Sequence, residues 1–296
     1  MEPARISFYD QIARNKRKSF FLMFCIFAVF LLLGYVISQI YSQGSFFTIM
    51  ILAIIISISY ILISYYNSDK IALASVNAKP ANRAMFRQYY DSVEGLTLAS
   101  GLPMPKLCVM NNEQINAFAT GRDPQHAVIC VTTGALEKLN KQELEGVLSH
   151  EMSHVANFDI RFMTLAAVMV GMIAIISEIF LRSLWFRSSG NDENKGNAVF
   201  LIIGIVLAIL APIAVQLVQL AISRKREFTA DATGVKFTRS PTGLANALRK
   251  IKNDKPMKVN KAVASLFMSD PFRRKVEGMM STHPDINMRI KILEQM

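Results

Sequence analysis

The most regular feature of the chain is the alternation of long uncharged apolar runs with charged polar segments. No charged residue lies between Lys18 and Asp69, and these 50 residues are too many for one membrane-crossing helix. The stretch divides at the polar residues 41–45 into Phe20–Ile40 and Phe46–Ser64, each with about the 20 residues that a helix needs to cross the hydrocarbon core. Because a second full span follows at once, the pattern favours an uncleaved helical hairpin over a signal peptide.

A second pair of apolar runs lies further along the chain. Residues 163–186 are apolar apart from Glu178 and Arg182, which stand four apart and can pair on one helix face. After a polar loop, residues 197–223 contain no charge and predict a fourth span. Because of its two charges, the third segment has an alternative interpretation as a partly embedded or cavity-lining helix.

Basic residues indicate which side of the membrane each segment faces. The first 18 residues contain five Lys or Arg and the tail from residue 223 onward contains sixteen, whereas the loop at 41–45 contains none. Cytoplasmic segments of membrane proteins are enriched in Lys and Arg. Both termini and the segment 65–162 are therefore expected in the cytoplasm.

The composition agrees with a membrane protein. Hydrophobic residues make up 52% of the chain, the mean hydropathy is +0.29 and the formal net charge is +11. The basic residues concentrate beside the apolar runs and belong to no nucleic-acid-binding motif, so the lipid bilayer and not nucleic acid is the expected partner. The three cysteines are odd in number and widely spaced, which predicts buried core residues and no disulfide framework.

The segment between the two apolar pairs has a mixed pattern. A helix is predicted from Asn82 to about Ser100. Strand composition with turn signals between the runs predicts three strands, at 106–110, 115–121 and 127–134, with a hairpin turn at 121–124. Asn140 can cap a following helix, with Glu143 as its capping-box partner. This order predicts a small α+β unit.

The helix after the strands carries the sequence His150-Glu151-Met152-Ser153-His154. The two histidines are four apart, so their rings lie on one helix face, where two imidazoles can bind one zinc ion. Glu151 can take a proton from the water that attacks a substrate. Coincidence is the alternative, but two of the four histidines of the chain fall in this motif, on a capped helix. The motif therefore predicts a zinc site.

A catalytic zinc site needs a third protein ligand and one open position. The candidates are Asp159, Glu227, Asp231, His126 and His283. If residues 163–223 form an antiparallel hairpin, its ends lie about 10 Å apart, which favours Glu227 opposite His154. Glu227 and Asp231 are four apart, so one can ligate while the other hydrogen-bonds a ligand histidine. The alternative is an ordinary surface helix with acidic residues among basic ones.

Four motifs in order carry a family resemblance. The segments "INAFATG" (115–121), "HEMSH" (150–154), "REFTADATG" (226–234) and "STHPDINMR" (281–289), in a basic chain with four predicted spans, closely resemble the HtpX family of bacterial heat-shock membrane zinc proteases. The resemblance covers most of the chain. CAAX prenyl proteases and soluble minigluzincins are more distantly similar, and the prenyl proteases are longer and have more spans.

The resemblance implies a gluzincin-like domain that binds one Zn²⁺ per chain. It implies His150, His154 and Glu227 as zinc ligands, Glu151 as the catalytic base and Asp231 as the hydrogen-bond partner of a ligand histidine. It also implies that Asn116 and Ala117 lie on an edge strand to which an extended peptide substrate adds. His283 and Arg289 resemble a His-Pro…Arg pair of the family that approaches the active site and can donate to an oxyanion. A surface loop followed by a helix is the alternative for Arg289.

The expected fold class is a mainly α membrane protein with four transmembrane helices and a cytoplasmic α+β gluzincin-like catalytic domain with a small β-sheet. Its expected parts are a basic N-terminus (1–18), a first transmembrane hairpin (19–65), a first catalytic segment (66–162), a second transmembrane hairpin (163–223) and a second catalytic segment (224–296). If the helix of His154 runs on to the apolar run, the zinc lies roughly 15 Å from that run, at 1.5 Å per residue.

The expected function is that of a zinc endopeptidase at the cytoplasmic face of a bacterial inner membrane. As the resemblance implies, its substrates are misfolded or damaged membrane proteins. The alternatives are a protease specific for prenylated peptides, a membrane scaffold with a structural zinc and a transporter. A structural site would need a fourth nearby Cys or His, and a transporter would need ionisable groups in its spans, which the first two spans lack.

Overall fold

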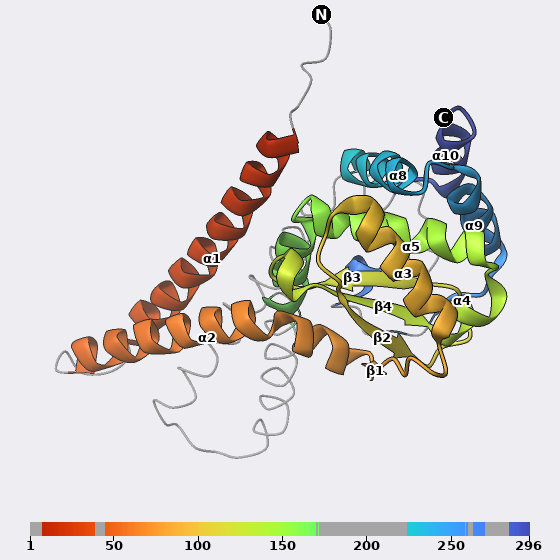
Figure 1. The fold of residues 1–296 in the computed structure, drawn as a ribbon. Coiled ribbons are helices and arrows are strands. Elements are labelled where there is room, and N and C mark those ends of the chain that lie inside the picture. The colour runs from red at the N-terminus through yellow and green to blue at the C-terminus, as the bar shows by residue number, and fades with distance from the viewer. Residues whose placement is uncertain are drawn as a thin grey trace, which may run out of the picture.

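The computed structural model describes residues 8–38, 45–169, 171, 224–257, 259, 263–269 and 284–296. The helices are α1 (Phe8–Ser38), α2 (Phe46–Ser75), α3 (Arg87–Ser100), α4 (Thr133–Lys138), α5 (Lys141–Ala156), α8 (Arg224–Thr238), α9 (Thr242–Asn253) and α10 (Ile286–Leu293), with short 3-10 helices η2 (Pro124–His126) and η3 (Ala264–Leu266). The strands are β1 (Lys79–Pro80), β2 (Lys106–Met110), β3 (Ala117–Thr120) and β4 (Val128–Thr132). The described part of the chain is therefore mostly helical with one small sheet (Figure 1), in agreement with the expected α+β unit.

The sheet is mixed and has the order β1-β2-β4-β3. The central strands β2 and β4 are parallel, while β1 pairs with β2 and β3 pairs with β4 in antiparallel fashion. All three strands predicted from the sequence are present, and the hairpin of β3 and β4 is confirmed. Because β3 is the last strand in the order, its outer edge is not paired within the sheet.

Both faces of the sheet are buried, and residues of β2 and β4 alternate between two cores. Val109 and Val131 face the larger core, which α3, α5 and α9 complete. Cys108 and Cys130 face a second core, which contains the end of α2 and residues 263–267. Both cysteines are buried and free, as predicted, whereas Cys25 of α1 is free but only partly buried.

Helix α5, which carries the histidine motif, begins as the sequence predicts. The Asn140 side chain accepts a hydrogen bond from the Glu143 N–H at 2.9 Å, and the Glu143 carboxylate accepts one from the Asn140 N–H at 2.8 Å. The helix does not run on to the apolar segment, which was the condition for the expected distance between the zinc and that segment. It ends at Ala156, because Asn157 terminates it and Phe158 takes a left-handed backbone conformation with φ 57°. Residues 159–169 then form a separate helical segment.

Helix α3 begins later than predicted, at Arg87 and not at Asn82. The Asn82 side chain accepts hydrogen bonds from the N–H groups of Ala84 and Met85, which holds a local turn in place of helix. The predicted end is correct. Gly101 has φ 71° and terminates α3 in the left-handed conformation that glycine adopts easily.

Helices α1 and α2 project from the sheet-containing part of the molecule (Figure 1). Their bounds fit the two predicted helices, while most of the predicted turn at 41–45 lies outside the described residues. Leu22, Ile26 and Tyr60 pack with residues 162–169 in a third core. Large apolar side chains elsewhere on both helices face outward, for example Phe20 at 70% and Phe47 at 74% exposure. Among the helices of the described residues, α2 alone is long and apolar enough to cross a membrane, judged by length and composition. The predicted fourth span and most of the third lie outside the described residues.

Helix α5 lies between α8 and α9, and glycines allow this close packing. A methyl group on Gly146 would come within 2.4 Å of the backbone nitrogen of Leu244 at the start of α9. One on Gly234 of α8 would come within 3.1 Å of the His150 backbone nitrogen. The small residues therefore bring α8 against the histidine-bearing face of α5.

Candidate metal centre

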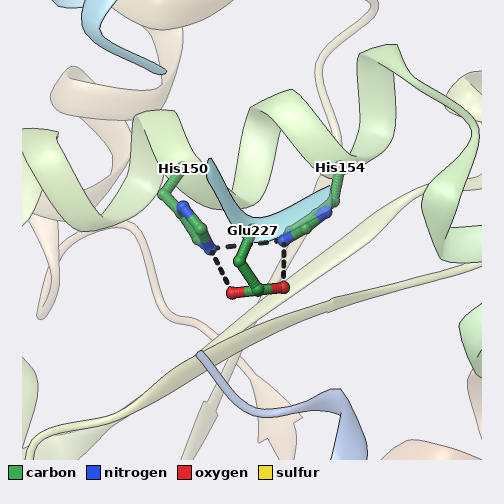
Figure 2. Close-up of side chains that lie close together, drawn as sticks. All are labelled: His150, His154 and Glu227. Atoms are coloured by element: carbon green, nitrogen blue, oxygen red, sulfur yellow. Dashed lines mark hydrogen bonds and ion pairs between the residues drawn. The ribbon is translucent and has the colours of Figure 1, made fainter. Parts of the chain in front are cut away.

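Three buried side chains from two helices converge on one point. His150 and His154 come from α5, Glu227 comes from the first turn of α8, and their ligand atoms all lie within 4.8 Å of one another. The two Nε2 atoms are 3.2 Å apart, and each lies 3.6 Å from a different oxygen of Glu227. Figure 2 shows that the carboxylate spans the gap between the two rings, with one oxygen facing a nitrogen of each. No more than 5% of any of the three residues is exposed.

This arrangement fits a bound zinc ion. Two nitrogen ligands about 2.0–2.1 Å from a tetrahedral zinc are about 3.3 Å apart, close to the 3.2 Å between the two Nε2 atoms. Two imidazoles and one carboxylate are also a donor set that zinc prefers. Three protein ligands leave a fourth position open, which is the pattern of catalytic and not structural zinc sites.

The carboxylate of Glu151 is buried beside the two histidines. It is 1% exposed, and its Oε1 has no hydrogen-bond partner among the described residues. Burial raises the pKa of Glu151 and the nearby Glu227 acts in the same direction, whereas the two histidines and a hydrogen bond from the Ala119 backbone lower it. A buried carboxylate with an unused oxygen is suited to accept a proton from a small polar molecule in the site.

Each histidine has a carboxylate on its other ring nitrogen. The Nδ1 of His150 is 2.8 Å from Asp231, and the Nδ1 of His154 is 3.1 Å from Asp159. A proton on Nδ1, donated to the carboxylate, leaves the Nε2 lone pair free to bind a metal. In that tautomer both Nε2 atoms, which face Glu227, are free to bind a metal.

The Asp231 carboxylate is held as an anion by Arg289 of α10. Although burial alone would raise the pKa of Asp231, the Arg289 guanidinium and the hydrogen bond to His150 lower it to about 2. Burial and Arg289 oppose a positive charge on His150, but hydrogen bonds to Asp231 and Glu227 outweigh them and raise its pKa. The carboxylates thus create a field that favours a cation at this point.

Comparison with known proteins agrees with this geometry. The model of the family described as Peptidase family M48 matches residues 84–296, which include both histidines, Glu151 and Glu227. The chain belongs to peptidase family M48. As a member of this family it is a metallopeptidase.

Among M48 relatives, proteins named "Protease HtpX homolog" are similar over nearly their whole length. The one from Caldanaerobacter subterraneus is 44% identical, with 97% of each chain covered. The one from Thermoanaerobacter pseudethanolicus is 42% identical, with 99% of each covered. The resemblance to the HtpX family that the motifs indicated is confirmed.

A solved structure is also similar, although distantly. The crystal structure of S. mikatae Ste24p is 19% identical with a TM-score of 0.46, covering 97% of this chain and 67% of that one. This likeness is too distant to support conclusions about the M48 site described here.

Asn116 and Ala117 were predicted to lie on an edge strand. Ala117 is the first residue of the edge strand β3 and Asn116 directly precedes it, and both are buried. Ala117 is fully buried, and its carbonyl accepts a hydrogen bond from the Met268 N–H at 2.9 Å. The Asn116 side chain donates to the Ser269 carbonyl at 3.2 Å and accepts from the Ala117 N–H at 3.0 Å. In this structure the chain itself, at Met268 and Ser269, therefore lies against the edge where a peptide was expected.

The remaining predicted site residues are placed as follows. Arg289 is buried against Asp231, and its Nη1 donates to the Met268 carbonyl at 3.2 Å. His126 is on η2, and its Nδ1 is 2.7 Å from an oxygen of Asp123. His283, predicted as a possible ligand and as a partner of Arg289, lies outside the described residues.

Three residues near the candidate metal centre were not predicted from the sequence to belong to the site. They are Asn15, Arg226 and Gly234. Arg226 looked like one of several basic residues before a helix, and Asn15 like a polar residue in a basic N-terminus. Only the position of Gly234, seven residues after Glu227 and thus two turns along the same helix, offered a signal of close packing.

Proposed function

We propose that the protein is a zinc-dependent endopeptidase of a bacterial inner membrane that cleaves misfolded or damaged membrane proteins on the cytoplasmic side. The observation that carries the proposal is the buried convergence of His150, His154 and Glu227 beside Glu151. The proposal includes His150, His154 and Glu227 as the three protein ligands of one Zn²⁺. When bound, zinc supplies a Lewis acid that polarises the scissile carbonyl and makes the attacking water more acidic.

In this proposal Glu151 moves the protons of the reaction. Its buried carboxylate accepts a proton from the attacking water while the water oxygen bonds to the carbonyl carbon. As the carbon–nitrogen bond breaks, Glu151 gives the proton to the leaving amine. Asp231 and Asp159 hold the Nδ1 protons of the two histidines, which keeps each ring in the orientation that presents Nε2.

An extended peptide is proposed to add to the outer edge of β3 near Ala117. Support comes from the backbone of Met268, which is held against this edge by hydrogen bonds on both sides of its Cα. Its N–H donates to the Ala117 carbonyl, and its carbonyl accepts from Arg289. A substrate that takes the same two hydrogen bonds requires the Met268–Ala117 bond to open. In such a pose Arg289 contacts the substrate main chain from a fixed position.

The membrane location is proposed from the arrangement of the apolar helices. Helix α2 exposes most of its apolar surface, and only 11% of its most apolar stretch is buried. Residues 162–169, which follow the site closely, pack against α1 and α2. A site this near to the apolar helices suits chain segments that emerge from a bilayer. Four spans, cytoplasmic termini and the division at residues 18, 65, 162 and 223 belong to the same proposal.

The test is cleavage of an unfolded membrane protein by the purified full-length chain loaded with Zn²⁺. We expect fragments from the wild type and a loss of rate of at least about 10²-fold in Glu151→Gln. Glu145→Gln is the matched control. It makes the same change on the same helix, at a carboxylate that lies 3.9 Å from Lys141 and is not part of the candidate metal centre. Equal rates for the wild type and Glu151→Gln would overturn the proposal.

A second arm of the experiment separates two classes of substrate. A farnesylated C-terminal peptide is supplied beside the unfolded membrane protein. The proposal requires the unfolded protein to be cleaved with the higher kcat/KM. Cleavage of the farnesylated peptide alone would assign the enzyme to prenyl-peptide processing instead.

A further inference from the structure

A buried polar cluster joins helix α1 to the metal centre. It consists of Asn15 from α1, Asn157 from the turn after α5, Asp159 from the start of the helical segment 159–169, and Arg226 from α8. All four are at most 6% exposed. We call it the Asn15 cluster. Its members come from three segments far apart in the sequence, and it lies directly behind His154, whose Nδ1 is 3.1 Å from Asp159.

Asp159 is the member that touches the metal centre. One of its oxygens faces His154. The other accepts a hydrogen bond from Asn15 Nδ2 at 2.7 Å and forms an ion pair with Arg226 Nε at 3.0 Å. With a charged partner and an amide donor on one oxygen, the carboxylate is held in one orientation. The sequence left Asp159 as one candidate for the third ligand, whereas its position behind the ring makes it a partner of the ligand His154.

Asn15 uses both ends of its amide in this cluster. Its Nδ2 donates to Asp159 and to the Asn157 carbonyl at 3.0 Å, and its Oδ1 accepts from Arg226 Nη2 at 3.0 Å. A neutral amide is the side chain that can donate to a carboxylate and accept from a guanidinium at once. Burying an amide costs free energy unless its hydrogen bonds are made. This buried position therefore suits a side chain that both donates and accepts hydrogen bonds.

We propose that Asn15 is a positioning residue for the metal centre. By fixing Asp159, it holds the His154 ring with Nε2 toward Glu227, so helix α1 contributes to the affinity for zinc. The inference rests on the proposed zinc ligands and goes beyond them, because it assigns a role in the catalytic site to the N-terminal helix. A purely structural tether between α1 and the rest of the chain is the competing explanation, and it predicts no effect on zinc.

The experiment measures the Kd for Zn²⁺ of the full-length protein by competition with a chelator. Asp159→Asn should weaken zinc binding by about 10-fold to 100-fold, the usual effect of losing a carboxylate partner of a ligand histidine. Asn15→Asp keeps the size of the side chain but cannot donate to Asp159 and adds a like charge. It should weaken zinc binding by about 10-fold, and Asn15→Leu by about threefold or more. Asn111→Ala, at an exposed position, is the control and should leave the Kd unchanged.

A double variant tests whether Asn15 acts through Asp159. In the Asp159→Asn background, Asn15→Leu should weaken zinc binding far less than it does in the wild type, because the group that it positions has already changed. Cobalt substitution gives a second measure. The visible absorption of Co²⁺ in Asn15→Leu should differ from that of the wild type if the ligand geometry changes.

The results separate this inference from the proposed function. Asn15 variants that lower the unfolding temperature of the metal-free protein but keep the wild-type zinc Kd and cobalt spectrum would overturn the inference alone. Fully additive effects of Asn15→Leu and Asp159→Asn on the Kd would also overturn it. A wild-type protein that binds no zinc would overturn the proposed function together with it.

Discussion

Arg289 of α10 and Asp231 of α8 form a buried two-point ion pair. The Arg289 Nε lies 2.8 Å from one carboxylate oxygen, and its Nη2 lies 2.6 Å from the other. The same carboxylate contacts the Nδ1 of His150 at 2.8 Å. The last helix of the chain therefore stabilises a carboxylate that orients a candidate metal ligand.

Replacing Arg289 should destabilise the protein. In Arg289→Ala the Asp231 carboxylate is left buried without its main partner, and we expect unfolding to become easier by roughly 3–5 kcal/mol. Arg289→Lys keeps the positive charge but loses the planar guanidinium that contacts both carboxylate oxygens. It should therefore lower the free energy of unfolding by less than Arg289→Ala does. Chemical denaturation in detergent measures both. If Arg289→Lys lowers kcat sharply at unchanged stability, the main role of Arg289 is contact with the reacting substrate.

Gly146→Ala tests the close approach of α5 and α9. The added methyl would lie 2.4 Å from the Leu244 nitrogen and 2.7 Å from the Gly243 carbonyl carbon, so the helices must move apart. We expect a loss of roughly 1–3 kcal/mol in the free energy of unfolding. Gly95→Ala is the matched control on α3, with nothing within 4 Å of the new methyl. Gly95→Ala should raise the free energy of unfolding by about 0.5–1 kcal/mol, because alanine is the better helix former. Equal effects of the two changes would contradict the packing.

Removal of zinc should abolish peptide cleavage and lower the unfolding temperature. At a zinc concentration of about 100 times the Kd, binding adds about 2.7 kcal/mol to the stability of the folded state. Zinc added back to the chelator-treated protein should restore both properties. Mg²⁺ should restore neither, because it prefers oxygen ligands to imidazoles. Thermal unfolding with and without zinc gives the measurement, and His154→Ala, which lacks a proposed ligand, should show a much smaller shift.

Asp254 should make the stability of the protein depend on pH. Burial alone would raise the pKa of Asp254, but hydrogen bonds from the Ile115 N–H at 2.6 Å and from Lys138 at 3.1 Å lower it below its usual value. Because the folded pKa is below the unfolded value of about 3.9, the carboxylate stabilises the fold above that pH, and the contribution is lost as the pH falls through the folded pKa. Asp254→Asn should lower the free energy of unfolding by about 1 kcal/mol at pH 7. The difference from the wild type should shrink toward pH 3, and a difference independent of pH would contradict this role.

Local features of the chain could be predicted from the sequence because their physics is local. The Asn140–Glu143 capping box and the i, i+4 spacing of His150 and His154 each depend on residues within one or two turns of helix. The strands and the α1–α2 hairpin follow from composition and from the length of the apolar runs. The prediction that failed, the start of α3, and the end of α5, which the sequence left open, both concern element ends. There, side-chain hydrogen bonds of Asn82 and one left-handed residue, Phe158, outweighed the pattern.

The sequence by itself determined that two histidines share one helix face and that the helix with these candidate metal ligands follows the strands. Only the tertiary structure decided which carboxylate faces them. Glu227 lies across both Nε2 atoms, while Asp231 and Asp159 lie behind the two rings. The reason is that these positions depend on how closely α8 packs on α5 and on where α1 and α10 dock. Buried polar side chains such as Asn15 and Arg289 find partners far along the chain, and no local pattern encodes such pairs.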